Sequence, residues 1–395
     1  MGLTTRTQVA IVGAGPAGLM LSHLLQARGV ESIVLECRSR EYVEDRVRAG
    51  VLEHNTVEIL CRYGLADRLK QHGLRHDGLW LSFGGTRHHI DMSELTGGKA
   101  ITVYGQHELV RDLIQARLSA GLPLEFNIAK LSLHDIDAEA PRVRYEKDGQ
   151  EREIVCDWIA GCDGSHGVCR TSARGLTEFE RVYPFAWLGI LAGAPPSSDE
   201  LIYTHHDRGF ALFSMRSPQV TRLYLQVDPE EQIESWSDDR IWEELFLRMS
   251  TRDGWSPNQG LISQKSITPM RSFVAEPMRW GSLFLAGDAA HIVPPTGAKG
   301  LNLAIADVAV LAPAIGEFYR TGRQDLLDQY SETCLRRVWK VQRFSWWMTS
   351  LLHRCPGDTP FDRRRQLAEL EYLTTSRAAM TALAENYVGL PLHFD

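Results

Sequence analysis

Three short segments that contain glycine occur along this chain in a fixed order. Gly13-Ala14-Gly15-Pro16-Ala17-Gly18 lies near the start, Cys162-Asp163-Gly164 in the middle, and Gly287-Asp288-Ala289-Ala290-His291 late in the sequence. Glycine turns that follow strands are typical of sites where the backbone comes close to a phosphate or a sugar. The three segments together predict that most of the polypeptide folds around one dinucleotide, FAD.

The first segment stands between residues 8–12, which read as a buried strand, and residues 19–28, which read as a helix. Glycine lets the turn close and lets the backbone approach a pyrophosphate, whose charge the helix N-terminus attracts. A second strand, residues 32–35, leads to Glu36, where an acid can bind ribose hydroxyls. A tight turn alone would also require glycine, but strand, helix and acid together favour dinucleotide binding. The predicted ligands are Gly13, Gly15, Gly18 and Glu36.

The late segment indicates a second contact with the same ligand. Residues 282–286 read as a short apolar strand leading to Asp288, whose carboxylate can accept hydrogen bonds from a sugar-alcohol chain. An extended loop, residues 294–300, feeds a helix over residues 301–315, and its donors and dipole favour negative charge on a bound ring. The strand with Asp288, or the loop with its helix, could each be ordinary structure with an exposed aspartate if it stood alone. That alternative is poor for both together.

These segments resemble those of the class A flavoprotein aromatic hydroxylases. Residues 283–303 and the run Ala384-Glu385-Asn386-Tyr387-Val388-Gly389-Leu390-Pro391 are similar in particular to the members that act on 4-hydroxybenzoate, and the similarity extends over residues 8–391. The resemblance implies that NADPH or NADH reduces FAD, that O2 then reacts, and that one oxygen atom enters the ring ortho to the phenol. The expected product is 3,4-dihydroxybenzoate. The same chemistry on another phenolic acid is the neighbouring interpretation.

The expected fold is α/β (α+β), with a Rossmann-like FAD-binding domain, an inserted sheet-based substrate domain and a C-terminal helical layer. Alternation between Leu79 and Phe83, followed by Gly84-Gly85, predicts a hairpin. The aromatic run over residues 344–348 is interpreted as core or as a surface that closes a homodimer. The predicted divisions are residues 1–180 for FAD, with 73–103 contributing to the substrate sheet, 181–268 for substrate, 269–316 for the return to the FAD domain, and 317–395 for a helical interface region.

Composition excludes several classes of function. A net charge of -7 and a pI near 6.1 give no global field for nucleic acid or an acidic membrane. The seven cysteines lack the spacing of a zinc site or a disulfide framework and suit a reducing cytoplasm. No stretch of about 18 uncharged apolar residues predicts a membrane span. The adjacent pairs His88-His89 and His205-His206 point to opposite faces of likely strands, so no metal site is predicted.

One pair of predicted strands presents polar side chains in a pattern suited to a carboxylate. Residues two apart on a strand share a face, so Ser214 and Arg216 point together, as do Arg222 and Tyr224 on the next strand. The guanidinium of arginine binds a carboxylate bidentately, and hydroxyls supply further donors. The exposed polar face of an antiparallel sheet is an equal alternative on the sequence alone.

The resemblance assigns roles to these residues. It implies that Ser214, Arg216 and Tyr224 hold the substrate carboxylate, while Tyr203 and Pro295 meet its phenolic end. It also implies that the phenol loses its proton through Tyr203, Tyr387 and His76, with His76 as the outlet to solvent. Packed aromatic rings and a surface imidazole are the alternatives for these three side chains.

The resemblance also implies contacts to both nucleotides. Cys37 departs from the arginine of a relative known for NADPH, and Glu44 and Asp45 weaken the local positive field, so the coenzyme choice stays open. Trp187 falls at a position near the flavin. The expected FAD contacts are Arg46, Arg48, Gln106, Asp163, Arg222, Asp288, Gly297, Lys299, Gly300, Leu301 and Asn302. The expected nicotinamide coenzyme contacts are His166, Arg170 and Arg271 for the phosphates and Arg38 with Tyr42 for a 2'-phosphate, with Arg40 as a further candidate.

Two other classes remain as competing hypotheses. A pyridine nucleotide–disulfide oxidoreductase is disfavoured, because the chain lacks a second glycine fingerprint and a closely spaced redox cysteine pair. A binding protein that kept the FAD fold without flavin chemistry is the non-enzymatic alternative. The intact late Gly287-Asp288 segment and its loop argue against it.

Overall fold

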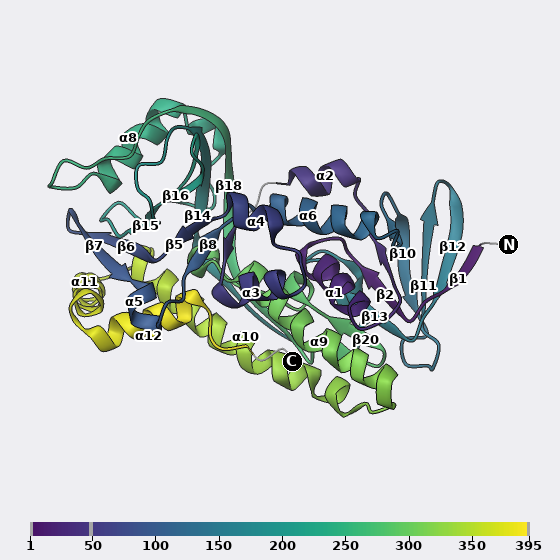
Figure 1. Ribbon diagram of the computed structural model, residues 1–395. Helices are drawn as coiled ribbons and strands as arrows, with labels where there is room; N and C mark the ends of the chain where they lie inside the picture. Colours follow the sequence, from purple (N-terminus) through teal and green to yellow (C-terminus); the bar gives the residue numbers. More distant parts are fainter. Residues whose placement is uncertain (1–2, 47–49, 393–395) are drawn as a thin grey trace.

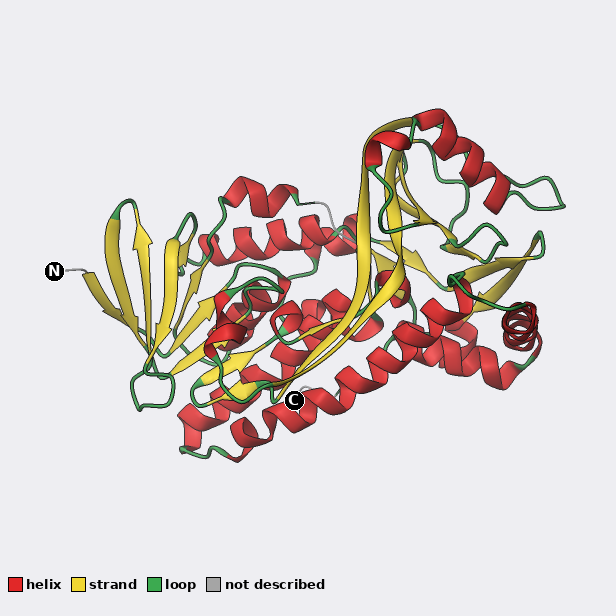
Figure 2. Cartoon of the chain, turned by 180° about the vertical axis from the view of Figure 1, so that it is seen from behind, coloured by secondary structure: helices red, strands yellow, loops and turns green. Residues whose placement is uncertain are grey.

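The computed structural model describes residues 3–46 and 50–392 and has two sheet-based parts that share a layer of helices. Figure 1 shows the cofactor part around β2 and α1, the second part around β14 and β16, and α10 running along both. The same arrangement is visible from behind in Figure 2. The expected fold class, a mixed α/β fold with an FAD-binding part, a sheet-based part and C-terminal helices, is confirmed.

A six-stranded sheet in the order β19-β20-β13-β2-β3-β9 forms the centre of the cofactor part. Residues 9–12 and 32–35 are continuous buried runs, as expected for parallel strands covered on both faces. Helix α1 begins with Pro16 in its first turn, where the missing N–H costs nothing, and packs on α9. The bounds are β2 Val9–Val12, β3 Ser32–Leu35, β9 Leu124–Glu125, β13 Trp158–Gly161, β19 Arg279–Trp280, β20 Leu283–Leu285, α1 Pro16–Gln26, α6 Gln106–Ser119 and α9 Gly300–Thr321.

An eight-stranded sheet in the order β21-β18-β14-β17-β16-β15-β6-β7 forms the second part. Strands β14 and β18 are long, with 17 and 16 residues, and run from the cofactor part into the second part. The predicted boundaries at 180/181 and 268/269 therefore fall inside continuous strands. The bounds are β6 Gly78–Phe83, β7 Thr86–Asp91, β14 Thr177–Gly193, β15 Ile202–Thr204, β16 Ala211–Ser217, β17 Val220–Val227, β18 Leu261–Glu276, β21 His291–Ile292 and α8 Asp238–Met249.

Two smaller sheets and several short helices complete the molecule, and of these α5 packs against α12 and β6. One sheet has the order β1-β12-β11-β10 and the other β4-β8-β5. The bounds are β1 Leu3–Arg6, β4 Val51–Leu52, β5 Leu74–His76, β8 Ile101–Val103, β10 Ala129–His134, β11 Arg142–Lys147, β12 Gln150–Val155, α2 Arg40–Asp45, α3 His54–Arg62, α4 Asp67–His72, α5 Met92–Thr96 and α7 Val168–Ser172. Single 3-10 turns are η1 Ile233–Ser235, η2 Gly287–Ala289 and η3 Pro295–Gly297.

The C-terminal helices are α10 Asp325–Leu352, α11 Pro360–Thr375 and α12 Arg377–Val388. Thr359 and Asp362 form a reciprocal capping box at the start of α11, which satisfies two backbone donors. Helix α9 is long and apolar enough by length and composition to cross a membrane, but 67% of its apolar window is buried in the protein. That burial is typical of a core helix, and α9 packs between α1 and α10.

Candidate functional site

The first glycine turn has one open side. Gly13 has a φ of +106°, and a side chain there would overlap the carbonyl of Cys162, while a side chain at Gly18 would overlap the carbonyl of Gly13. Packing inside the protein therefore requires these two glycines. At Gly15, by contrast, no atom lies within 4 Å of the position of a Cβ. Gly15 borders free space at the N-terminus of α1, which fits a pyrophosphate.

Glu36 closes the same turn from the end of β3. Its Oε2 accepts a hydrogen bond from the backbone N–H of Ala14 at 2.8 Å, and its Oε1 accepts one from Arg38 N at 2.9 Å. The carboxylate is thus held beside the turn, next to the open space at Gly15. Its role toward a ribose stays a prediction.

The late segment is held by its neighbours while Asp288 is exposed. Tyr330 Oη donates to the carbonyl of Leu285 at 2.8 Å, and the backbone N–H of Gly287 donates to Asp307 Oδ2 at 2.9 Å. The backbone of Gly287 has a φ of +64°, which favours glycine. A rigidly held turn with a projecting carboxylate fits the predicted contact to a sugar-alcohol chain.

The side chain of Lys299 has partners inside the protein, and a contact between Lys299 and FAD stays a prediction. Its ammonium is 2% exposed and donates to Glu53 Oε1 at 2.6 Å and to the carbonyl of Tyr387 at 2.8 Å. Burial lowers the pKa of Lys299, and the Glu53 carboxylate opposes that shift. The side chain therefore joins the start of α9 to α12, because a buried ammonium needs a charged partner.

The side chain of Asn302 also has its partners inside the protein, and a contact between Asn302 and FAD stays a prediction. Its Oδ1 accepts from Glu53 N and Thr56 Oγ1, both at 2.8 Å. Its Nδ2 donates to the carbonyls of Val51 at 2.9 Å and Ala298 at 3.0 Å. All four bonds that an amide side chain can make are thus formed. The expected flavin contacts of Gly297, Gly300 and Leu301, just before and at the start of α9, also stay predictions.

Other predicted FAD contacts are only partly brought together. Asp163 Oδ2 accepts from Cys169 N at 2.9 Å, and its buried Oδ1 has no partner among the described residues. Burial raises the pKa of Asp163. Arg46 is exposed at the end of α2, and Gln106 is the first residue of α6. Arg48 lies outside the described residues.

A guanidinium without an acidic partner lies at the centre of the predicted carboxylate site. Arg216 Nη1 donates to Ser214 Oγ at 3.3 Å, and Ser214 is 3% exposed. Arg216 Nε is buried without a hydrogen-bond partner among the described residues, and no carboxylate in residues 3–46 or 50–392 forms an ion pair with Arg216. Burial lowers the pKa of Arg216. A partly buried cation in this state favours binding of an anion.

The neighbouring strand completes this site. β16 and β17 pair so that Ser214 lies opposite Arg222 and Leu212 opposite Tyr224. The guanidinium of Arg222 lies 5.3 Å from the ring centre of Tyr224, and Arg222 Nε is also buried without a partner among the described residues. The alternating faces predicted from the sequence are present, although a contact between Arg222 and FAD stays a prediction.

Two tyrosine hydroxyls meet near this predicted carboxylate site, since Tyr203 on β15 pairs with Leu212 on β16. Tyr203 Oη lies 2.6 Å from Tyr387 Oη and donates to the carbonyl of Thr296 at 3.0 Å. Each of the two tyrosines is 1% exposed, and burial raises the pKa of both hydroxyls. Since each hydroxyl has one proton, Tyr387 donates to Tyr203 whenever Tyr203 donates to Thr296. The adjacent Pro295 is exposed on the loop.

His76 is buried and forms no hydrogen bond with the tyrosine pair. It is 1% exposed, and neither of its ring nitrogens has a partner among the described residues. Burial lowers the pKa of His76 to about 4. A proton that passes from the tyrosines to His76 therefore needs a bridging group such as water.

Sequence reasoning missed a buried histidine behind the pocket wall. Trp187 Nε1 donates to His353 Nε2 at 2.6 Å, and His353 Nδ1 lies 2.9 Å from the carbonyl of Thr349. Burial lowers the pKa of His353 to about 3, so the ring is neutral and accepts from the indole. The ring of Trp187 lies 4.8 Å from that of Tyr224, which gives the pocket a fixed aromatic wall. A lone histidine in a helical segment gives no signal of this role.

The predicted nicotinamide contacts form two separate groups. Arg170 and Arg271 lie over the ring of Phe273, at 4.4 and 6.0 Å, and pair with Glu178 and Glu180. His166 is exposed. In the other group, the guanidinium of Arg38 lies 5.3 Å from the centre of the half-exposed Tyr42 ring, while Arg40 pairs with Glu44 at 2.6 Å. Glu44 thus neutralises one of the arginines predicted to meet a 2'-phosphate.

Comparison with known proteins gives one consistent result. A family model described as FAD binding domain matches residues 6–345. The chain is 52% identical over 390 residues to a p-hydroxybenzoate hydroxylase of Acinetobacter baylyi, which covers 98% of this chain and 96% of that protein. It is 26% identical to a 6-hydroxy-3-succinoylpyridine 3-monooxygenase of Pseudomonas putida, over 90% of this chain and 92% of that one. The crystal structure of a p-nitrophenol 4-monooxygenase from Pseudomonas putida has a TM-score of 0.85 at 21% identity, with 99% and 100% of the two chains covered, and shares the fold.

Proposed function

The chain belongs to the p-hydroxybenzoate hydroxylases of the FAD-binding domain family, and we infer from its site how it carries out that reaction. It is a flavoprotein monooxygenase that uses FAD with NADPH or NADH and O2 to convert 4-hydroxybenzoate to 3,4-dihydroxybenzoate. The substrate carries a carboxylate and a phenol at opposite ends of one ring. The pocket offers a separate partner for each end.

The partly buried guanidinium of Arg216 is the observation on which this assignment depends. It has a hydroxyl neighbour, Ser214, but no acidic partner among the described residues. A substrate carboxylate would supply the missing charge and accept from Arg216, Ser214 and Tyr224. The ring would then lie against the aromatic wall of Trp187 and Tyr224, which excludes water.

The tyrosine pair serves the other end of the substrate. A phenol attacks an electrophilic oxygen well only after it loses its proton. Tyr203 can accept that proton while passing its own to Tyr387, because their hydroxyls are 2.6 Å apart. His76, reached through a bridging water, then receives the proton without opening the ring pocket to solvent. Pro295 holds the loop whose Thr296 carbonyl orients Tyr203.

FAD fits the open side of the first turn and the projecting carboxylate of the late segment. When bound, it supplies the hydride acceptor for NADPH or NADH and the site at which O2 is activated. Gly15 and the N-terminus of α1 would face its pyrophosphate, Glu36 its ribose and Asp288 its sugar-alcohol chain. The backbone amides at the start of α9 would face its ring.

The assembly and the compartment are further parts of the proposal. Large apolar side chains are exposed on α10 and α11, with Trp339 and Trp346 each 42% exposed and Phe361 75% exposed. We propose that this face closes a cytoplasmic homodimer, since exposed patches of this kind mark interaction sites. Light scattering at micromolar concentration should give twice the chain mass of 44.5 kDa. A measured mass of one chain would contradict the proposed dimer, but it would not affect the proposed enzyme function.

Product identification tests the function directly. The FAD-loaded protein is incubated with 2-, 3- and 4-hydroxybenzoate and with 4-hydroxybenzamide, under NADPH and under NADH. We expect 3,4-dihydroxybenzoate from 4-hydroxybenzoate and far less turnover of the amide, which lacks the charge that Arg216 requires. If the enzyme hydroxylates another phenolic acid faster, the proposed substrate is wrong but the reaction class is kept. No hydroxylated product from any member of the panel would contradict the proposal.

A further inference from the structure

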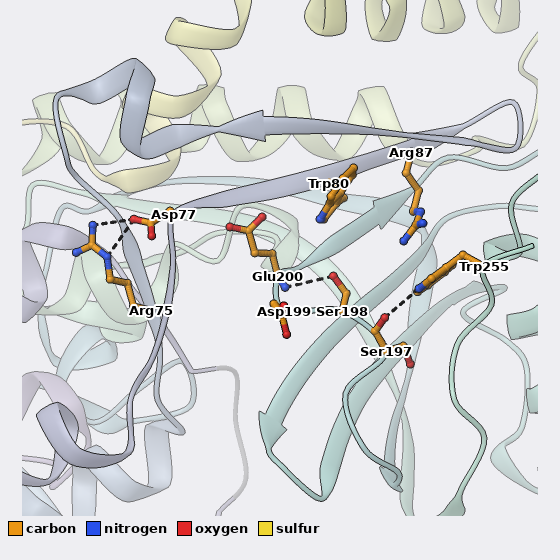
Figure 3. Close-up of a pocket in the computed structure, with 9 residues that line it drawn as sticks. All are labelled: Arg75, Asp77, Trp80, Arg87, Ser197, Ser198, Asp199, Glu200 and Trp255. Atoms are coloured by element: carbon orange, nitrogen blue, oxygen red, sulfur yellow. Dashed lines mark hydrogen bonds and ion pairs between the residues drawn. The ribbon is translucent and has the colours of Figure 1, made fainter. Parts of the chain in front are cut away.

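A pocket of about 520 Å³ is lined by the two chain neighbours of His76, Arg75 and Asp77, and by the loop before β15 (Figure 3). Figure 3 shows Asp77, Asp199 and Glu200 at one end of this pocket and the tryptophan side chains at the other. The chain segments that carry these acids come from the start of β6 and from the loop before β15. Neither the substrate site nor the cofactor contacts proposed above use this pocket.

The loop of residues 197–201 runs alongside the segment that carries His76. Strands β15 and β6 are parallel, with Ile202 opposite Trp80, and Trp80 N donates to the carbonyl of Leu201 at 2.8 Å. Gly78 N donates to Glu200 Oε1 at 2.6 Å. Asp199 precedes Ile202 by three residues and Asp77 precedes Trp80 by three residues, and both line the pocket.

The three acids of the pocket differ in what they bind. Asp77 accepts two hydrogen bonds from Arg75, at 3.0 and 2.7 Å. Glu200 accepts from Gly78 N and lies 2.7 Å from His89 Nε2. Asp199 is exposed, and its carboxylate forms no hydrogen bond or ion pair within the part of the chain that the structure describes. It is therefore the carboxylate of this pocket that is free to accept a proton.

We propose that Asp199 carries the proton of the relay from His76 to solvent, an inference that rests on the proposed function. Because no side chain of the described residues lies within hydrogen-bond distance of the His76 ring nitrogens, the transfer needs a bridging water. The N–H bond formed on His76 breaks as an O–H bond forms on this water, one of whose own O–H bonds breaks as an O–H bond forms on Asp199. Asp199 then gives the proton to bulk water or to a buffer base. These steps transfer only a proton and involve no oxidation or reduction. The imidazole of His76 returns to its neutral form. Asp199 and Tyr203 lie within five consecutive residues, residues 199–203. The proton would therefore leave the protein close to the tyrosine that first accepts it.

The state of His76 makes an onward acceptor necessary. Burial lowers the pKa of His76 to about 4, and the charges of Asp199 and Asp77 act in the opposite direction. The imidazole is thus neutral near pH 7 and holds a proton only in transit. The charged groups on the elements around it are Arg75 and Asp77 beside β5, Asp199 and Glu200 before β15, Arg87 and His89 on β7, and the pair Glu94 and Arg377 on α5 and α12.

The test follows ionisation of bound substrate in the absence of NADPH and NADH. FAD-loaded protein with bound 4-hydroxybenzoate is shifted rapidly from low to high pH, and the absorbance of the phenolate is recorded in a weakly buffered solution. Asp199→Asn should slow the appearance of phenolate by about tenfold or more. Imidazole added to the solution should restore the rate in the variant and leave the wild type unchanged. The affinities for FAD and for 4-hydroxybenzoate should stay as in the wild type.

Two controls separate proton transfer from a general effect of charge. Asp77→Asn removes a charge from the same pocket but from a carboxylate already held by Arg75, and Asp228→Asn removes an exposed charge at the end of β17. Both should ionise the substrate at the wild-type rate. A wild-type rate in Asp199→Asn, a slow rate that imidazole does not raise, or equal slowing in Asp77→Asn would overturn the inference. Wild-type enzyme that forms no 3,4-dihydroxybenzoate would instead remove the proposed function.

Discussion

His291 Nε2 lies 2.7 Å from Asp307 Oδ2, and the same oxygen accepts the backbone N–H of Gly287. Both side chains are buried, and they come from different elements, β21 and α9. One carboxylate on the helix therefore fixes both ends of the turn that carries Asp288. A charged residue inside the apolar run of α9 was visible in the sequence, yet its partner was not.

Asp307→Asn should loosen this turn, because an amide replaces the charge-assisted bond to His291. We expect the Kd for FAD to rise by about tenfold and the apo protein to lose about 1–3 kcal/mol of stability. Although burial acts against it, the Asp307 carboxylate raises the pKa of His291. The contribution of the pair is thus full below the unfolded pKa of about 6.5 and is lost as pH rises through the higher folded value. Melting temperatures of both proteins should converge at alkaline pH, and a constant difference would contradict this account.

Gly15→Val and Gly18→Val should separate cofactor binding from folding. A side chain at Gly15 has no atom within 4 Å, so the apo protein should keep its melting temperature while FAD occupancy falls. A side chain at Gly18 would overlap the carbonyl of Gly13, so this variant should be destabilised by about 1–3 kcal/mol before any cofactor is added. Flavin absorbance per protein and thermal unfolding of apo protein are the two measurements. If the Gly15→Val protein binds FAD stoichiometrically, Gly15 does not face the pyrophosphate.

Arg216→Ala should weaken binding of 4-hydroxybenzoate by about 2–5 kcal/mol, because the carboxylate would be buried without a cation. The uncharged 4-hydroxybenzamide should bind both proteins with similar, low affinity. FAD content should stay normal, and Arg216→Lys should recover only part of the affinity, since an ammonium cannot bind the carboxylate bidentately. Titration followed by flavin absorbance provides the constants. Equal affinity of Arg216→Ala and the wild type for 4-hydroxybenzoate would place the carboxylate elsewhere.

Tyr203→Phe should uncouple consumption of NADPH or NADH from hydroxylation. Substrate binding and flavin reduction do not need the phenolate and should persist, whereas product per coenzyme oxidised should fall by about tenfold or more. The missing oxygen should appear as hydrogen peroxide. Tyr387→Phe removes the next hydroxyl, 2.6 Å away, and should show a milder form. Full coupling together with normal ionisation of bound substrate in Tyr203→Phe would rule out the relay.

Replacing Arg38 and Arg40 by glutamine tests the choice of coenzyme. Arg40 already pairs with Glu44, while Arg38 lies over the ring of Tyr42. We therefore expect Arg38→Gln to raise the apparent constant for NADPH several-fold and Arg40→Gln to change it little, with NADH unaffected by either. Initial rates with both coenzymes give the constants. Equal effects on NADPH and NADH would show that this segment does not bind a 2'-phosphate.

The features that were predictable from the sequence are local or repeat at a fixed spacing. Strand β3 occupies residues 32–35 as expected, and Gly84-Gly85 joins β6 to β7. The shared face of Ser214 and Arg216 follows from the two-residue period of a strand. Partners far apart in the chain were not predictable. The Lys299 to Glu53 pair spans 246 residues, so neither residue alone indicates that the ammonium belongs to another side chain.

The long strands β14 and β18 have a consequence for how this enzyme can move. Tyr224 on β17 pairs with Gly189 on β14, β14 pairs with β18 along most of its length, and Val274 on β18 pairs with His291. A ladder of paired strands thus runs from the substrate anchor to the cofactor turn, with register shifts near Val182 and Leu191. A hinge between the two parts would have to break that ladder. Adjustment to ligands of different size must therefore come from side chains, loops and the bound molecules themselves, and not from closure of one part on the other.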